Sequence, residues 1–192
     1  EVVIWDGSTM SAVATSPDAT TGFAWETVGF GSISDNYTTT CGEKSYSKYL
    51  PSGGAATSRY MTLTVPAGYV AKFYVVMASH SDGSERGMFI GSNLVKNPDA
   101  TSVLELSNND RDVAVAGMSE IVGAGTYYLN PNASIDIQEI RAYLRKGYVR
   151  SAMLGAGVYG TICVDHNVAV EDIQGATMYE LMSRENTYGK LA

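Results

Sequence analysis

Reactive side chains are scarce in this sequence. The 192 residues include two histidines, His80 and His166, and two cysteines, Cys41 and Cys163. Nucleophilic catalysis needs a serine or cysteine beside a positioned base, and a zinc site needs a second ligand pair at regular spacing. No such pair follows Cys163 and His166, and His80 is expected in a solvated turn. The sequence therefore predicts a protein that is not an enzyme, with no metal site of the zinc type.

Positive charge and long apolar runs are also in short supply. The sequence has 13 Lys and Arg against 20 Asp and Glu, which gives a formal net charge of −7. Such a chain repels a phosphate backbone and has no basic stripe for counterion release. Its longest apolar stretches, such as residues 73–78, are much shorter than the ~20 residues of a membrane-spanning helix. We expect neither nucleic-acid binding nor a membrane span.

The two cysteines and the first residue bear on the cellular compartment. Cys41 and Cys163 allow one disulfide but do not require it, because cysteine also serves as a small buried apolar side chain. The sequence starts at Glu1, so we expect either a mature chain after removal of a leader or a piece of a longer protein. Export is compatible with both.

Apolar and polar residues alternate along most of the sequence, as in short strands, and helical periodicity is rare. Residues 60–65 alternate and end at a Pro-Ala-Gly turn, and residues 69–77 repeat the pattern. Further strands are expected at 86–90, 102–106, 112–116 and 126–129. The side chains expected to face the interior are Met61, Leu63, Val65, Phe73, Val75 and Met77. This spacing predicts an all-β protein built as a β-sandwich.

Residues 133–144 form the longest strand-like run, and its alternation changes phase. Ile135 and Ile137 share one face, whereas the apolar residues at 140, 142 and 144 have the opposite parity. A β-bulge near Gln138–Glu139 would bring all of them to one inward face. Apolar residues at 137, 140 and 144 also fit a helix, but the β-rich neighbourhood favours the strand.

A boundary is expected at residues 145–147, where a basic cluster precedes a glycine-rich pattern. Residues 1–146 then form a β-sandwich module and residues 147–192 a partial β unit, with strand-like segments at 159–164 and 176–182. The second unit is too short to bury a core of its own. We expect it to pack on the first unit or to be completed by another chain.

Several of these segments together resemble a known group of modules. Residues 59–66, 69–78, 85–90 and 125–129, with the run at 135–144 and the opening Ile4-Trp5-Asp6-Gly7, are similar to jelly-roll β-sandwich modules attached to secreted pectate-lyase-like and other surface proteins of Bacteroidetes. Residues 159–163 and 175–180 resemble the start of a second small β unit in the same proteins. The resemblance implies an antiparallel jelly-roll-like sandwich with a short additional β segment at the C-terminus, an extracellular or cell-surface location, and carbohydrate binding by association.

Glycan binding requires an aromatic plane that stacks on a sugar face, with fixed hydrogen-bonding groups beside it. Arg59 and Tyr60 are adjacent, Lys72 and Tyr74 have the outward parity of the next strand, and Arg86 opens the strand after that. These five residues are the candidate ligand-binding patch. The alternative is that Tyr60 and Tyr74 are ordinary cross-strand partners on a half-buried sheet. The two tryptophans, Trp5 and Trp25, are expected in the core.

Acidic residues offer no catalytic pair but leave calcium open. A glycosidase needs two carboxylates facing each other across a cleft, and no pair in the sequence stands out. Clusters at 110–112 and 165–172 are rich in oxygen ligands, so a structural calcium is one alternative and turn capping is the other. No other cofactor is expected.

The sequence therefore predicts a non-catalytic extracellular module that binds polysaccharide or another glycan, or mediates adhesion, on a bacterial surface. The alternative is a structural subunit of a surface filament or stalk. In that alternative, neighbouring copies are joined by strand exchange through residues 2–5 or through the tail. The glycan and the oligomeric state are not specified by the sequence.

Overall fold

The computed structural model describes residues 1–54, 57–147, 149–154 and 158–163, the last two stretches as backbone. All regular secondary structure in these described residues is β-strand, which confirms the all-β prediction. The strands are β1 (Val2–Asp6), β2 (Ala24–Val28), β3 (Thr39–Cys41), β4 (Lys44–Tyr46), β5 (Leu50–Pro51), β6 (Tyr60–Val65), β7 (Tyr69–Ser79), β8 (Arg86–Gly91), β9 (Leu104–Asn108), β10 (Val115–Met118), β11 (Gly125–Pro131), β12 (Ile135–Lys146), β13 (Val149–Leu154) and β14 (Val158–Cys163).

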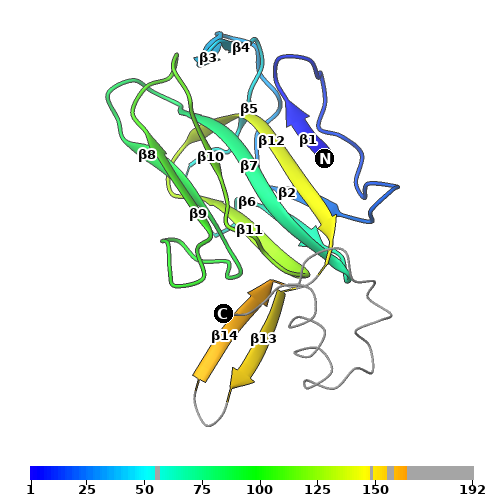
Figure 1. Ribbon diagram of the computed structural model, residues 1–192. Coiled ribbons are helices and arrows are strands. Elements are labelled where there is room, and N and C mark those ends of the chain that lie inside the picture. Colours follow the sequence, from blue (N-terminus) through cyan, green and yellow to red (C-terminus); the bar gives the residue numbers. More distant parts are fainter. Residues whose placement is uncertain (55–56, 148, 155–157, 164–192) are drawn as a thin grey trace.

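Two five-stranded antiparallel sheets form the sandwich. The first sheet has the order β1-β12-β7-β10, with β5 also on β12, and the second has the order β2-β6-β11-β8-β9. Figure 1 shows β7 and β12 side by side at the centre of the first sheet. When β1 and β6 to β12 are counted in chain order from one to eight, the sheets read 1-8-3-6 and 2-7-4-5. This is the arrangement of an eight-stranded jelly roll, as the sequence predicted.

The core lies between the inward faces of the two sheets. All six side chains that the alternation assigned to the interior are buried there, and so are Trp5 and Trp25. Phe23 contacts both Trp25 and Phe73 at ring-centroid distances of 5.7 and 6.2 Å, so aromatic rings from the two sheets meet in the middle of the sandwich. Burial of this apolar surface is the main favourable contribution to folding.

The predicted β-bulge in the longest strand is confirmed. The pairing of β12 with β7 shifts between Ile137 and Glu139, so Ile140 and Ala142 face the core in the same way as Ile135. On its other side β12 pairs with β1, and that register also shifts, between Val3 and Trp5. These two irregularities leave Glu139 directly opposite Asp6, with both side chains on the outer face of the first sheet.

A short hairpin that the sequence did not predict covers part of this outer face. Tyr46 of β4 and Cys41 of β3 pack over Val76, Ala78 and Ala114. Together these residues form a second, small apolar cluster on the outer face of the sheet. Strand β3 is attached to the segment before β10, because Thr40 forms backbone hydrogen bonds with residues 112 and 114. The first sheet is therefore covered over one part of its outer face and open over the rest.

The two ends of the chain bear on strand exchange and on the second unit. The N-terminal strand, expected to exchange in the assembly alternative, is paired with β12 of its own chain. Residues 149–154 and 158–163 form a two-stranded antiparallel hairpin, which agrees with a strand near 159–164. The predicted strand at 176–182 lies outside the described residues, and the boundary at 146 stays a prediction.

Trp5 offers a test of how β1 is held against β12. Its indole nitrogen donates a buried hydrogen bond to the carbonyl oxygen of Ile137, beside the bulge, at 2.9 Å. We expect Trp5→Phe to lower the free energy of unfolding by about 1–3 kcal/mol, because the buried carbonyl oxygen of Ile137 loses this hydrogen bond. Urea denaturation measures the change. Trp25→Phe is the control and should cost less, because its 3.2 Å bond to Ala14 is only partly buried.

Candidate functional site

The five residues predicted to bind ligand lie in three places. Lys72 and Tyr74 are on the outer face of the first sheet, in β7. Tyr60 is on the outer face of the second sheet, where its ring meets Tyr128 edge-on at 5.8 Å. The side chains of Arg59 and Arg86 reach backbone carbonyls of residues 54 and 134 at one end of the sandwich. The prediction that all five form one patch is wrong, because the sandwich separates the two sheet faces.

The open part of the first sheet's outer face carries an aromatic and basic surface. Tyr74 lies between Arg141 on β12 and Met118 on β10, and Lys72 lies opposite Tyr143. Tyr143 is 38% exposed and Met118 is 45% exposed, whereas Tyr74 is half-buried. We call these five residues the aromatic surface. The sequence pointed to two of them, and the other three join them only through strand pairing.

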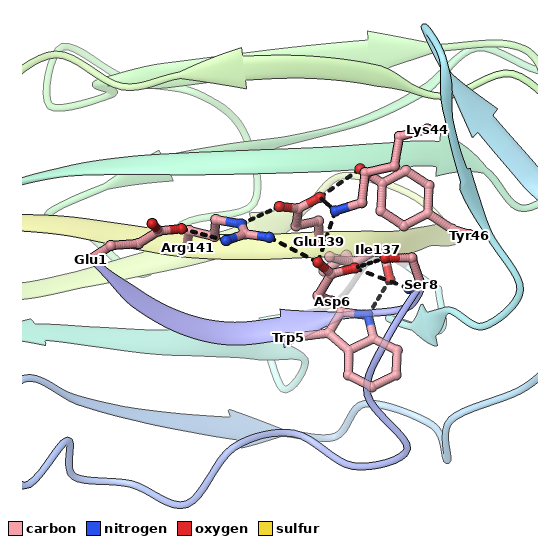
Figure 2. A network of polar contacts seen from close by, with 9 residues as sticks. All are labelled: Glu1, Trp5, Asp6, Ser8, Lys44, Tyr46, Ile137, Glu139 and Arg141. Atoms are coloured by element: carbon pink, nitrogen blue, oxygen red, sulfur yellow. Dashed lines mark hydrogen bonds and ion pairs between the residues drawn. The ribbon is translucent and has the colours of Figure 1, made fainter.

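A network of charged groups, drawn in Figure 2, shares Arg141 with the aromatic surface. The ammonium group of Lys44 donates to Asp6 at 2.8 Å and to Glu139 at 2.6 Å. Arg141 donates to Asp6 at 2.8 Å and also contacts the carboxylates of Glu139 and Glu1. The guanidinium of Arg141 is thus held by three carboxylates, so its orientation beside Tyr74 is set before any ligand arrives.

The network shifts the pKa values of its members in a consistent way. Burial works to raise the pKa of Asp6, but hydrogen bonds from Lys44 and Ser8 outweigh burial and hold that pKa below its ordinary value. Burial and the nearby carboxylate of Glu139 raise the pKa of Tyr46, whose hydroxyl donates to Glu139 at 2.5 Å. Asp6 is therefore a charged acceptor between the two cations Lys44 and Arg141.

This arrangement suits a structural role better than a catalytic one. A glycosidase acid must hold a proton near neutral pH, and the lowered pKa of Asp6 works against this. Glu139 is almost fully buried beneath Lys44 and Tyr46. The network instead ties β1, β12 and the β3–β4 hairpin together. Sequence reasoning missed it, because its carboxylates are at opposite ends of the module.

His80 was expected to be a solvated turn residue, and it is exposed in a bend directly after β7, but it has an acidic partner that the sequence did not indicate. Its Nδ1 atom lies 3.0 Å from both carboxylate oxygens of Asp136. The side chain of Asp136 is fully buried, whereas that of His80 is 47% exposed. Burial raises the pKa of Asp136 to about 7. Among the described residues the ring has no hydrogen bond to a serine or cysteine, so the pair is not extended to a nucleophile.

The remaining site predictions concern thiols and metals. The side chain of Cys41 is half-buried, and that of Cys163 lies outside the described residues, so their pairing stays a prediction. Asp110 accepts backbone hydrogen bonds from residues 112 and 113, which is turn capping. In the part of the chain that the structure describes, no group of three or more metal-ligating side chains comes together, and no helix could cross a membrane. The acidic cluster at 165–172 lies outside that part.

Comparison with known proteins gives similarity to solved structures, carbohydrate-binding modules and domains of enzymes among them. No protein-family model matches the sequence, and no curated protein matches it. The C-terminal CBM6 of LamC, a laminarinase from Zobellia galactanivorans, is 16% identical, with a TM-score of 0.31, over 62% of this chain and 98% of that one. The module CBM6cm-2 of Cellvibrio mixtus lichenase 5A, solved with cellotriose, is 12% identical with a TM-score of 0.33, over 61% and 95%. The CBM22-1 xylan-binding domain of Paenibacillus barcinonensis Xyn10C is 10% identical with a TM-score of 0.40, over 74% and 91%.

Replacing Lys44 tests the structural role of the network. We expect Lys44→Met to lower the free energy of unfolding by about 1–2 kcal/mol at neutral pH, because two carboxylates lose a charged donor that solvent partly screens. The pKa of Asp6 is lowered on folding, so this contribution is present above its unfolded pKa and is lost as the pH falls through the folded value. Urea titrations at neutral and acidic pH measure both effects. Lys48→Met, which removes a lysine outside the network, is the control, and an equal loss in both variants would contradict the role.

For Asp136 we expect the free energy of unfolding to change with pH in the opposite direction to that of Asp6, because its pKa is raised on folding. The folded carboxyl has a pKa of about 7 against an ordinary value of 3.8, so the folded chain keeps a proton that the unfolded chain releases. As the pH rises between these values, the unaltered chain should lose stability relative to Asp136→Asn. Urea midpoints at about pH 5 and about pH 8 measure the difference. Parallel pH profiles for the two proteins would rule the effect out, and Asp35→Asn serves as an exposed control.

Proposed function

We propose that this chain is a non-catalytic module that binds a polysaccharide chain across the aromatic surface of its first sheet. The observation that carries the proposal is the composition of that surface. Two tyrosines, Tyr74 and Tyr143, lie on adjacent strands, and a lysine and an arginine are paired opposite them. This combination supplies stacking planes and hydrogen-bond donors, which are the two requirements for holding a sugar.

The geometry of the strands supports an elongated ligand. Tyr143 is the diagonal neighbour of Tyr74, because Tyr74 is opposite Arg141 and Tyr143 is two residues further along β12. Diagonal neighbours on a sheet are ~7–8 Å apart, which is within reach of aromatic side chains that act on one ligand. A sugar chain lying across β7 and β12 would contact both rings.

Preorganisation adds to the affinity that such a surface can reach. Binding normally costs conformational entropy for each long side chain that is immobilised. Arg141 has already met this cost, since three carboxylates hold its guanidinium. Tyr74 is also constrained, because it packs against the apolar cluster under the β3–β4 hairpin.

The module is proposed to work outside the cell, on a bacterial surface or in a secreted protein. This part of the proposal rests on the resemblance noted in the sequence.

Alanine substitution on the aromatic surface tests the proposal. We expect Tyr74→Ala and Tyr143→Ala each to weaken binding about fivefold or more, because each removes a stacking plane worth about 1 kcal/mol or more. Affinity gel electrophoresis against a panel of neutral and acidic polysaccharides measures the retardation. The unaltered chain should be retarded by at least one polymer.

Tyr60→Ala is the matched control, because it removes the same side chain from the opposite face of the sandwich. Failure of the unaltered chain to bind any polymer would contradict the proposed function. Binding that persists in Tyr74→Ala but disappears in Tyr60→Ala would move the site to the second sheet.

A further inference from the structure

Two arginines, Arg59 and Arg86, are bound to the backbone at the same end of the sandwich, away from the aromatic surface. Arg59 donates from Nη1 to the carbonyl oxygen of Gly54 at 3.2 Å, and Arg86 donates from Nη1 to that of Ser134 at 3.2 Å. Gly54 lies against both groups: a Cβ there would be 3.2 Å from Nη1 of Arg59 and 3.8 Å from the hydroxyl of Ser134. The two guanidinium groups thus converge on the segment around Ser134.

Strand register explains why these side chains gather there. Arg59 is two residues before Met61 and Arg86 is two residues before Met88, and both methionines face the core. The arginines therefore have the inward parity, but they lie at the ends of β6 and β8, beyond the core. Because β6 and β8 pair with opposite sides of β11, the two arginines flank the chain where it leaves β11.

The charges of the pair are not matched by acidic side chains. Among the described residues, no carboxylate lies within ion-pair distance of Arg59 or Arg86, whereas Arg111 and Arg141 both have such partners. A guanidinium has five N–H donors, and each of these two uses one in the hydrogen bonds described above. Two half-buried cations without anions are notable in a chain of net charge −7.

The neighbouring acidic group is already engaged. Asp136, at the start of β12, is fully buried and faces the ring of His80 rather than the arginines. The backbone nitrogen of His80 donates to the same carbonyl of Ser134 as Arg86 does, at 3.3 Å. His80 therefore lies beside Arg86 at this end, and the side chains of His80, Arg59 and Arg86 are all at least partly exposed there.

We infer that this end of the sandwich is a second binding site, which takes a carboxylate or sulfate group of an acidic polysaccharide. Arginine is the side chain best suited to such groups, since its planar fork makes two parallel hydrogen bonds to their oxygens. That the anion belongs to a glycan rests on the proposed function, whereas recognition of the anion rests on the arginines alone. The site would add acidic sugars to what the aromatic surface binds.

The experiment compares acidic and neutral polymers on the purified full chain. Polygalacturonate supplies carboxylates, dextran sulfate supplies sulfates and dextran supplies neither, and affinity gel electrophoresis measures retardation by each. We expect Arg59→Gln and Arg86→Gln each to weaken binding to at least one acidic polymer by about tenfold or more. Binding of any neutral polymer through the aromatic surface should be unchanged. Raising the salt concentration should weaken acidic binding only.

Two controls separate the site from charge and from folding. Lys96→Gln removes one positive charge from an exposed loop and should bind acidic polymers like the unaltered chain. Arg59→Lys and Arg86→Lys keep the charge but lose the fork, so they should bind acidic polymers more weakly than the unaltered chain. Urea midpoints verify that each variant is folded, and the Lys variants replace any Gln variant that is not.

The outcomes distinguish this inference from the proposed function. Acidic binding that is equal in the Arg59, Arg86 and Lys96 variants, or no binding of either acidic polymer by the unaltered chain, would overturn the second site. Neutral binding that depends on Tyr74 would leave the proposed function standing in either case. Acidic binding that depends on the arginines but not on Tyr74 would support the second site, whereas the aromatic surface would be contradicted by the absence of any polymer binding that depends on Tyr74 or Tyr143.

Discussion

The pairing of β12 with both β1 and β7 is the constraint on which the rest of this structure depends. It joins the first strand of the chain to the last strand of the sandwich and places both beside the long central strand β7. A bulge in β12 keeps Ile135 and Ile140 facing the same core although their parity differs. Without that extra residue, a one-residue slip would turn one half of the strand's apolar side chains toward water.

The same bulge organises the outer face of the sheet. It sets Glu139 opposite Asp6, and the two carboxylates then need cations, which Lys44 and Arg141 supply. Because Lys44 belongs to the β3–β4 hairpin, the charged network also fixes how much of the face is covered. The open part, with its tyrosines, borders a rigid arginine. The core-packing requirement and the candidate binding surface thus have one origin.

Much of the fold could be predicted from local pattern. Alternation in residues 60–65 and 69–77 identified the inward side chains correctly, and the phase change at 137–140 indicated the bulge. These features are visible because a strand's side chains alternate with a period of two wherever one face is buried. The β3–β4 hairpin was missed, since its strands are only three residues long and their pattern is too short to recognise.

The candidate sites were predictable only in part. The sequence indicated Lys72 and Tyr74, because outward parity and residue type are local properties. It could not place Tyr143 and Arg141 beside them, since those residues belong to a strand about 70 positions further along the chain. Which residues of the two strands lie opposite each other depends on the pairing register. It also grouped Tyr60 with Tyr74, which the sandwich places on opposite faces.

The sequence by itself determined that this chain is all-β, which side chains enter the core and that histidine and cysteine chemistry is sparse. Each of these follows from composition and short-range periodicity. Only the tertiary structure decided which outward side chains become neighbours, that Asp136 is buried against His80, and that Arg59 and Arg86 lie at one end of the sandwich without acidic partners in the described part of the chain. The reason is that contacts between distant strands depend on sheet order and register, and no local pattern encodes them.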